Sequence, residues 1–593
     1  MNNTKIWASL HPFFEQGPAL GRTEANRRFL HALVEADPFD AYSFFLPHPD
    51  DCERLKGELA ARWPDMVKDG RFAVRLHREF PVALRECDYY CLHLSDPFVR
   101  YTDGICLRNA FSRRIFPVTA PTHSLSYAEY GPLFLHHMWP GVTSRDVLAA
   151  TSTCGARAVA AYYSSLRGAY RLSAEEFPSP AVRIVPLGVE PALMPSPEEK
   201  DALGRQCRQQ YGLGDRVVFL VFARLSYQSK MDLLPLLRAC KRAEENGLRP
   251  EDYCLTLAGW LDKDDAFDKD IQRLAANLGI CLRVVPRPDD AARKGLYAAA
   301  DVFLSPSDNV QETFGLTVLE AALSGLPVVA SDFDGYRDLV DDGESGFLIP
   351  SLGPAATPGT DCLARIVPAA EHHLLLAQQT AVDTRALGQA MRRLAADKTL
   401  RLRMGRAGRR RVLAAYTWRH IIKRYTALWA ELNDGPCELP DNAAARPPKA
   451  VFHPACPPSR ELFGHYFASR VDAPAVRDKM LVWSKAGRAV YHGQDFPVIY
   501  RLVERYITPD NLKKLLFRAR RPISVASLRS LCREFLPDGV PGDEDFVLLW
   551  ALKHDFLEFC PQPDPANDQA RRNNPTGLVL GREYPAMPSA SCR

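Results

Sequence analysis

The sequence lacks the features that mark membrane, secreted and nucleic-acid-binding proteins. No window approaches the roughly 18 uninterrupted apolar residues that a membrane-spanning helix needs. The N-terminal stretch has no signal-peptide pattern, because His11 and Pro12 break its short apolar run. The net charge is only +4 at pH 7, which argues against wholesale binding of nucleic acid. These absences predict a cytoplasmic protein with reduced thiols.

Cysteine pairs and tandem repeats are missing as well. The fifteen cysteines are scattered without any C-x-x-C pair, so each is interpreted as core filler rather than as a nucleophile. Asp262 and Asp264 look superficially like a metal-binding D-x-D pair, but they are interpreted as part of a solvated loop. At 593 residues the chain is too long for one domain, and a prior of roughly 150 residues per domain suggests three or four.

Short apolar segments alternate with helical stretches, and this pattern occurs twice along the chain. Residues 5–10 and 88–96 are such segments in the first half, and residues 217–225 are one in the second. The alternation predicts parallel sheets covered by helices on both faces. We therefore expect two doubly wound, Rossmann-like α/β domains, residues 1–190 and 191–413, that face a cleft. A ligand in such sheets meets the carboxyl ends of the strands.

The composition changes after the second α/β domain. Residues 435–459 are rich in proline and alanine and are predicted to be a linker. Residues 460–560 are predicted to form a mostly helical accessory domain that looks like a winged-helix module, a likeness that does not define function. The polar, proline-rich tail 561–593 is predicted to be disordered.

Two groups of basic residues suggest further partners. The accessory domain has a basic face opposed by acidic residues 543–545; the face consists of Lys513, Lys514, Arg518, Arg520 and Arg521. Winged-helix modules read DNA or dock peptides, and we expect this one to dock an acceptor or a protein partner. The basic run from Arg401 to Arg424 is interpreted as a solvated helix face. The alternative is peripheral contact with anionic lipid at the inner face of a membrane.

The stretch ETFGLTVLEAALSGLPVVASDFDG, which begins at Glu312, carries the clearest functional signal. Its next residues, Thr313, Phe314, Gly315 and Leu316, turn a loop into a helix. Free backbone N–H groups at that point suit an anion, and a glycine lets a ligand approach the backbone closely. We therefore predict a binding site for an anionic ligand at the start of this helix.

A second glutamate, Glu320, lies within the apolar run. It shares a helical stripe with Leu316 and Leu323, which turns it inward. A buried carboxylate needs hydrogen-bond donors, and the vicinal hydroxyls of a ribose supply them. The pattern therefore favours a nucleotide as the partner of Glu320.

This stretch resembles the E-x7-E region of glycosyltransferase family 4, whose members are retaining nucleotide-sugar glycosyltransferases with the two-domain GT-B fold. RIVPLGVE, FARLSYQSKMDLL and MGRAGRRRVLAAYTWRHIIKRYTALW resemble further parts of that family, and the resemblance covers roughly residues 1–435. It implies that Glu320 holds the ribose and that Glu312 lies beside the transferred sugar. It also implies that a helix over residues 414–434 crosses back to the first domain.

The resemblance assigns roles to other residues. Arg224 and Lys230, at the carboxyl end of a strand, match the basic pair that stabilises the charge of the departing diphosphate; the alternative is two solvated loop cations. His123 matches a histidine near the sugar, and the alternative is an ordinary loop histidine. Gly17 and Gly21 lie in a loop that could let the backbone approach the diphosphate, although a plain turn is as compatible with them.

One departure from the family pattern concerns the acceptor. Where many relatives have a Gly-Gly pair, this chain has Asp334 and Gly335 followed by Tyr336, which we expect to intrude near the diphosphate or the acceptor. The expected activity is retaining transfer of a sugar from a nucleoside-diphosphate sugar to an unidentified acceptor, without metal or cofactor. A nucleotide-sugar epimerase of the same fold and a non-catalytic sugar-nucleotide sensor are the alternatives.

Overall fold

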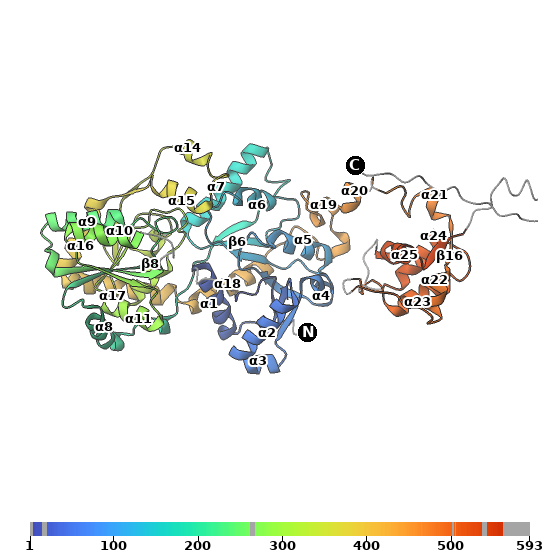
Figure 1. The fold of residues 1–593 in the computed structure, drawn as a ribbon, viewed down its shortest axis with the longest axis horizontal. Coiled ribbons are helices and arrows are strands. Elements are labelled where there is room, and N and C mark those ends of the chain that lie inside the picture. Colours follow the sequence, from blue (N-terminus) through green and yellow to red (C-terminus); the bar gives the residue numbers. More distant parts are fainter. Residues whose placement is uncertain are drawn as a thin grey trace, which may run out of the picture. The chain divides into compact units, whose positions relative to one another are not determined.

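The computed structural model describes residues 4–14, 21–260, 267–463, 465, 467–500, 503–504, 506–536 and 543–560 of the chain. Gly17, Asp262 and Asp264 lie outside these ranges, as does the tail 561–593 that the sequence predicts to be disordered. The chain divides into two compact units between Pro457 and Pro458 (Figure 1). Within the described ranges, no helix is both long enough and apolar enough to cross a membrane.

The first α/β domain is built on a seven-stranded sheet in which all neighbouring strands are parallel. The strand order is β3-β2-β1-β4-β5-β6-β7, so it reverses between β1 and β4. The strands are β1 (Ile6–Ser9), β2 (Ala41–Leu46), β3 (Phe72–Leu76), β4 (Tyr89–His93), β5 (Val118–Pro121), β6 (Asp146–Ala150) and β7 (Ala181–Ile184). The helices are α1 (Gly21–Ala36), α2 (Pro49–Arg62), α3 (Pro64–Lys68), α4 (Phe80–Glu86), α5 (Tyr101–Phe111), α6 (Tyr130–His136) and α7 (Thr153–Tyr170).

The second α/β domain repeats this plan with a six-stranded parallel sheet of order β10-β9-β8-β11-β12-β13. Its strands are β8 (Val217–Arg224), β9 (Tyr253–Trp260), β10 (Leu282–Pro286), β11 (Val302–Ser305), β12 (Val328–Ser331) and β13 (Gly346–Ile349). Its helices are α8 (Pro197–Tyr211), α9 (Leu234–Glu245), α10 (Phe267–Leu278), α11 (Asp290–Ala299), α12 (Leu316–Leu323), α13 (Tyr336–Leu339), α16 (Thr384–Ala396) and α17 (Lys398–Ala415). Figure 1 shows α9, α10 and α16 on one face and α8 and α11 on the other. The uninterrupted apolar sequence of β8 reflects this burial on both faces. The prediction of two doubly wound domains is confirmed.

An excursion leaves the second domain after β13. It starts at β14 (Ser351–Leu352), contains α14 (Pro358–Asp361) and α15 (Ala369–Ala377), and returns at β15 (Ala381–Val382), which pairs antiparallel with β14. From α15, His373 Nε2 donates to the Ser126 carbonyl of the first domain at 3.3 Å. The excursion therefore contacts both domains.

Helix α18 (Trp418–Asp434) packs on the first domain, although it follows the second in sequence. Trp429 Nε1 donates to Thr119 Oγ1 of β5 at 2.9 Å. Apolar side chains at spacings of three and four residues form one helical face, and the buried ones are Trp418, Ile421, Ile422, Tyr425, Leu428, Trp429 and Leu432. Because α18 follows the second α/β domain in sequence and packs on the first, it links the two domains.

Residues 435–457, here called the strap, lie against the first domain, although the composition predicts a linker at 435–459. Arg446 is buried, and its Nη1 donates to the carbonyls of Arg108 and Asn109 at 3.1 and 2.7 Å. Burial, and then the nearby Arg108 charge, lower the pKa of Arg446 to about 10. An irregular segment stays ordered here because its polar groups find partners on the domain.

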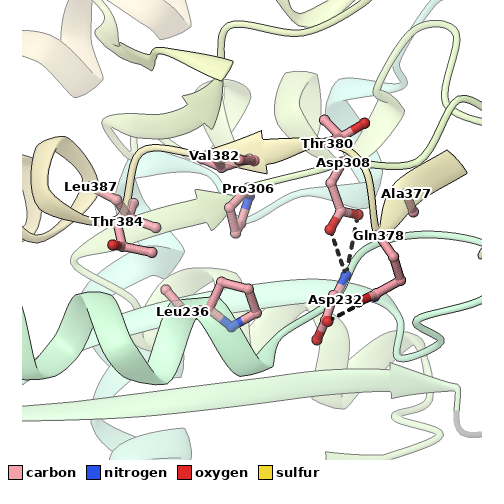
Figure 2. Close-up of a pocket in the computed structure, with 12 residues that line it drawn as sticks. Asp232, Leu236, Pro306, Asp308, Ala377, Gln378, Thr380, Val382, Thr384 and Leu387 are labelled. Atoms are coloured by element: carbon pink, nitrogen blue, oxygen red, sulfur yellow. Dashed lines mark hydrogen bonds between the residues drawn. The ribbon is translucent and has the colours of Figure 1, made fainter. Parts of the chain in front are cut away.

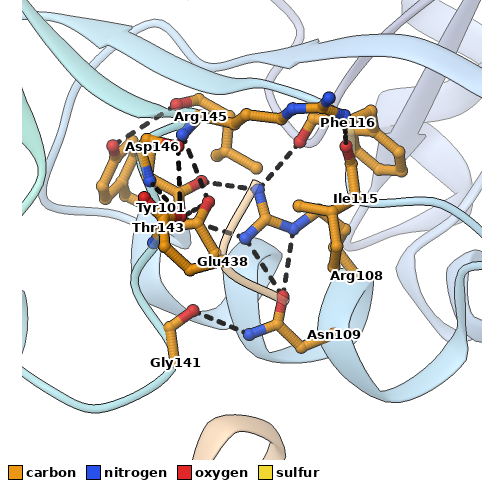
Figure 3. Close-up of polar contacts among 12 residues, drawn as sticks. Tyr101, Arg108, Asn109, Ile115, Phe116, Gly141, Thr143, Arg145, Asp146 and Glu438 are labelled. Atoms are coloured by element: carbon orange, nitrogen blue, oxygen red, sulfur yellow. Dashed lines mark hydrogen bonds and ion pairs between the residues drawn. The ribbon is translucent and has the colours of Figure 1, made fainter. Parts of the chain in front are cut away.

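The strap covers a buried ion pair (Figure 3). Arg108 and Asp146 are both 0 % exposed and join through two bonds, of 2.6 and 3.0 Å. Asp146 also accepts from the backbone N–H and the hydroxyl of Thr143. From the strap, Glu438 accepts from the Ser144 N–H at 3.0 Å. The strap and this network form one packed layer.

The second unit is mostly helical. It contains α20 (Ser459–Phe463), α21 (Pro474–Arg477), α22 (Lys485–Tyr491), α23 (Pro509–Arg518), α24 (Val525–Glu534) and α25 (Asp543–Lys553) around an antiparallel sheet of order β17-β16-β18. The strands are β16 (Met480–Trp483), β17 (Ile523–Ser524) and β18 (Leu557–Phe559). The acidic residues of α25 contact α24, because Glu544 pairs with Arg533 and Asp545 with Arg529. The winged-helix likeness stays a prediction.

Candidate active site

Glu312 lies in the loop between β11 and α12, at the carboxyl end of the second sheet. Its Oε2 pairs with Lys230 and accepts from the Tyr336 hydroxyl at 3.2 Å. Its Oε1 accepts from the backbone N–H groups of Thr313 and Phe314 at 3.2 and 3.3 Å. Two of the N–H groups that the sequence offers to an anionic ligand are therefore held by the chain's own carboxylate.

The charges around Glu312 shift two pKa values in opposite directions. Burial would raise the pKa of Glu312, but the Lys230 ammonium outweighs it and holds that pKa below its ordinary value. Burial, and then repulsion by Glu312, raise the pKa of Asp334 to about 8. The site thus holds one carboxylate that is ionised at neutral pH and a neighbouring carboxyl that stays largely protonated.

The loop that carries Lys230 is held by three successive residues of the neighbouring loop. Ser307 Oγ donates to the Lys230 carbonyl at 3.1 Å, and Asn309 Nδ2 donates to the Gln228 carbonyl at 2.9 Å. Between them, the Asp308 carboxylate accepts from the Asp232 N–H at 3.3 Å (Figure 2). Because all three contacts reach the backbone, they fix the path of the loop and so the position of the Lys230 ammonium.

A cavity of about 280 Å³ lies beside this contact. Apolar side chains such as Leu236 and Leu387 line it (Figure 2). Gln378, which follows α15, donates to Asp232 at 3.1 Å at its edge. Burial raises the pKa of Asp308 to about 7. The excursion and the Lys230 loop are therefore joined through Asp232.

Arg224 is the last residue of β8 and lies next to the same loop. Its Nη1 donates to Ser229 Oγ at 3.0 Å, one residue before Lys230. The structure thus brings the two predicted basic residues to one loop at the carboxyl end of β8, near Glu312.

Glu320 is buried in α12 and has partners within the chain. It pairs with Arg293 and accepts from the Tyr297 hydroxyl at 3.2 Å, both from α11. The sequence argument that a buried carboxylate there needs an external donor missed Arg293, which lies 27 residues earlier. A role in holding a ribose stays a prediction, and it now requires that the sugar share this carboxylate with Arg293.

Tyr336 does not intrude into open space, contrary to the expectation from the sequence. It is 0 % exposed and lies beneath the Glu312 loop, with its hydroxyl 2.7 Å from Ser305 Oγ. A Cβ added at Gly315 would come within 2.5 Å of the Tyr336 ring, and Gly315 has a φ of +110°. Gly315 is thus required by packing and by its left-handed backbone, and Leu316 begins α12 directly after it.

On the first domain, polar groups gather at the carboxyl ends of β1, β4 and β5. His123 Nε2 donates to the Ser95 carbonyl at 2.9 Å, and burial lowers the pKa of His123 to about 4, so its ring is neutral. His11 Nδ1 accepts from the Ser95 N–H at 3.0 Å. Gly21 begins α1, and a Cβ there would meet nothing within 4 Å, so no packing constraint explains it.

The two domains meet on both sides of Glu312. Gln311 Nε2 donates to the Tyr127 hydroxyl at 2.7 Å, and Ser124 Oγ donates to the Gln311 carbonyl at 3.0 Å. On the other side, Ser152 Oγ donates to the Thr313 carbonyl at 2.7 Å. The loop of Glu312 therefore bridges the two α/β domains.

Several residues of this site escape sequence reasoning. Arg293 and Asp308 show no local signal beyond their residue type, because their partners are distant in the sequence. Ser152, which caps α7 by accepting from the Gly155 N–H, carries only a helix-start signal. Asp334 was noted as a departure from the family pattern, and its left-handed φ of 46° explains why a glycine also suits this position.

Two facing doubly wound domains, joined by a helix that crosses back, define a protein of the GT-B class. Residues 205–357, in the second domain, match the family model described as glycosyl transferases group 1.

Curated relatives agree with this family. The chain is 31 % identical over 182 residues to a D-inositol 3-phosphate glycosyltransferase of Acidothermus cellulolyticus, covering 30 % of this chain and 39 % of that protein. It is 36 % identical over 89 residues to a phosphatidyl-myo-inositol mannosyltransferase of Mycobacterium leprae, covering 15 % and 24 %. The chain thus spans about two fifths or less of the length of these relatives.

Solved structures also resemble the chain. One is a sucrose-phosphate synthase from Thermosynechococcus elongatus, 19 % identical, which covers 72 % of this chain and 99 % of that one with a TM-score of 0.46. Another is a glycosyltransferase from Rickettsia africae, 13 % identical, which covers 74 % and 100 % with a TM-score of 0.47.

Proposed function

We propose that the protein is a retaining glycosyltransferase that moves a sugar from a nucleoside-diphosphate sugar to an acceptor. The observation that carries the proposal is the pair of Lys230 and Glu312 where the two domains meet, inside a domain that matches the glycosyl transferases group 1 family model. The curated relatives named above are glycosyltransferases, which supports sugar transfer rather than epimerisation or sensing.

In this proposal Lys230 changes partner during the reaction. Its ammonium balances Glu312 before the donor binds and turns to the departing diphosphate, where negative charge develops, with Arg224 beside it. Glu312, ionised at neutral pH, then faces the sugar. The phosphate oxygen that leaves the anomeric carbon takes the proton of the acceptor hydroxyl as the new glycosidic bond forms on the same face.

The nucleoside is proposed to bind along α12, with Glu320 accepting from a ribose hydroxyl. Gly315 and Leu316 line the approach of the diphosphate to the start of that helix. No step in this scheme requires a metal or a cofactor, because positioning and fixed charges supply the catalysis.

The second unit is proposed to dock a protein or peptide partner that is acidic. A groove of about 680 Å³ there combines aromatic and basic side chains: Tyr491, Lys513, Lys514, Phe517, Arg518 and Phe535. Arg520 stacks on the Phe517 ring at 3.9 Å. The acidic residues of α25 that pair with α24 cannot neutralise this groove at the same time, so charge complementarity favours an acidic occupant.

Donor hydrolysis tests the proposed activity. The full chain would be incubated with UDP-, GDP- and ADP-sugars, and release of the nucleoside diphosphate and the anomeric form of the freed sugar would be followed by NMR. We expect one donor class to raise the melting temperature and to be hydrolysed slowly with retention. Glu312→Gln should abolish hydrolysis, whereas Glu344→Gln, an exposed residue of the same domain, should not. Inversion at the anomeric carbon, or equal hydrolysis by Glu312→Gln, would contradict the proposal.

A further inference from the structure

The end of the strap places two metal-ligating side chains on one tight turn. The Cys456 N–H donates to the His453 carbonyl at 2.9 Å, which closes a turn that has Pro454 at its second position. The side chains at the two ends of such a turn lie close together. They face His136, the last residue of α6, and the ligand atoms of the three residues all lie within 4.8 Å of one another.

The hydrogen bonds of His453 set its ring in the form that a metal needs. Nε2 donates to the His136 carbonyl at 2.9 Å, so this nitrogen carries the proton. Nδ1 therefore has the electron pair, which accepts from the Ala455 N–H at 3.0 Å in the absence of metal; a metal bound at Nδ1 replaces this hydrogen bond, and the exposed turn lets the Ala455 N–H turn to water. A ring that donates one N–H to a backbone carbonyl and offers its other nitrogen is the usual arrangement of a metal-bound histidine.

The ligand atoms of His136 and Cys456 also lie close to each other. His136 Nε2 lies 3.9 Å from Cys456 Sγ, and the two histidine rings lie 3.9 Å apart between centroids. Burial lowers the pKa of both His136 and His453, which keeps the rings neutral. The thiol of Cys106, on α5, lies against the backbone of His453 and interacts with Cys456.

We propose that His136, His453 and Cys456 bind one Zn²⁺ ion that fastens the end of the strap to α6. Two imidazoles and a thiolate suit Zn²⁺, whose bonds of about 2.0–2.3 Å place ligand atoms roughly 3.3–3.8 Å apart. The exposed side chain of Cys456 closes the remaining gap by rotation about its Cα–Cβ bond. Binding releases the thiol proton to solvent, and the fourth position is left to water.

This site differs in purpose from the proposed sugar-transfer site. It comes at the last residues of the first unit, directly before the boundary between Pro457 and Pro458. A metal here holds the strap at the point where the second unit begins, without entering the cleft. No local sequence pattern marks this site, because His136 and His453 are 317 residues apart.

Cobalt binding tests the site. The full chain, purified without a histidine tag and treated with chelator, would be titrated with Co²⁺ and then competed with Zn²⁺. We expect one equivalent to give a tetrahedral d–d spectrum with a sulfur-to-cobalt charge-transfer band that Zn²⁺ removes. Cys456→Ser should lose the charge-transfer band. His136→Ala should weaken binding by more than the roughly 10- to 100-fold that loss of an outer-shell partner costs.

Cys362→Ser is the matched control, since Cys362 is another exposed free cysteine of the same unit. It should bind Co²⁺ as the parent protein does. Limited proteolysis gives a second measurement, because Zn²⁺ should slow cleavage around residues 452–458 in the parent and not in Cys456→Ser. Absence of stoichiometric binding, or a charge-transfer band that survives in Cys456→Ser, would overturn the proposal.

Discussion

Two ion pairs of the first unit differ in their exposure, in the number of bonds that join them and in their surrounding partners. Arg108 and Asp146 are fully buried, joined by two bonds, and surrounded by further partners from the domain and the strap. Lys230 and Glu312 are 20 % and 9 % exposed, and a single ammonium joins them. A guanidinium that binds a buried carboxylate through two bonds is fixed in place. An ammonium on a flexible, partly exposed side chain can turn from one anionic partner to another. The first pair therefore suits a structural role, and the second has the exposure that the proposed change of partner by Lys230 requires.

Breaking the buried pair should give the largest effect on stability. Arg108→Met leaves the Asp146 carboxylate buried without its counter-ion, so we expect the free energy of unfolding to fall by about 3–5 kcal/mol. Urea unfolding of the full chain measures this. The double variant Arg108→Met, Asp146→Leu should recover much of the loss. If the single variant is as stable as the parent, the pair does not have the structural role that its burial suggests.

Lys230→Ala should act on turnover instead. The charge on the departing diphosphate grows toward the transition state, so we expect turnover to fall by roughly 10²–10³ while donor affinity changes less. Steady-state kinetics with the donor that the hydrolysis experiment selects would separate turnover from donor affinity. Lys241→Ala removes a lysine from a pair on α9 and is the control. A variant whose donor Michaelis constant alone rises would show that Lys230 serves binding only.

Truncation measures how much the strap contributes to stability. The composition suggests a cut near residue 440, but that cut removes Arg446 and its contacts with the layer around Arg108. We expect a chain ending at 440 to lose about 1–3 kcal/mol of stability, whereas a chain ending at 457 should unfold like the first unit of the parent. Both should retain donor hydrolysis, and transfer to the native acceptor should fall if the second unit docks it. Insolubility of the chain ending at 457 would place the boundary elsewhere.

Glu320 offers an intermediate case, because Arg293 already pairs with it. Glu320→Gln keeps the shape and a hydrogen-bond acceptor, so we expect folding to survive and donor affinity to weaken by roughly 1–3 kcal/mol. Calorimetry with the donor would measure it. Unchanged affinity in a folded variant would mean that Glu320 serves only to hold Arg293.

The last expected effect is a change in the pH dependence of stability. The pKa of Asp334 is raised from its ordinary value of 3.8 to about 8 on folding, so the folded state binds a proton that the unfolded state releases. This contribution is present below about pH 4 and is lost as the pH rises toward 8. Glu312, whose pKa is lowered, contributes in the opposite sense, as the pH falls below its ordinary value of 4.5.

Asp334→Asn should therefore flatten the decline in melting temperature between pH 5 and pH 8, as measured by differential scanning fluorimetry. Asp361→Asn, on the exposed helix α14, is the control and should leave the slope unchanged. A parent protein whose stability does not fall over this range would show that Asp334 ionises normally.

The sequence predicts the architecture well because a sheet that is buried on both faces needs apolar strands such as β8. Their alternation with helices is a local pattern that can be recognised in the sequence. The sequence also predicts that Arg224, Lys230 and Glu312 lie near one another, because the loops that follow neighbouring parallel strands meet at the carboxyl edge of the sheet. It does not reveal that Arg293 pairs with Glu320. Nor does it show that Tyr336 fills the space beneath Gly315. These depend on contacts between elements, which have no periodic signature.

The strap shows a further limit. Its proline-rich composition predicts a linker that is free of the domain, yet the strap includes the short helix α19 (Pro448–Val451). The buried guanidinium of Arg446 has the opposite consequence, because each of its donors needs an acceptor from the fold. Composition alone therefore does not show whether such a segment is attached to the domain.

The loop of Glu312 is bonded to the opposite domain at both neighbours, Gln311 and Thr313. The two sheets cannot separate without moving that loop. In the proposed reaction, release of the nucleoside diphosphate and displacement of Glu312 are therefore one event, a motion that displaces water. Its rate should fall as solvent viscosity rises, so an added viscogen such as sucrose would slow turnover wherever opening, rather than bond formation, limits the cycle.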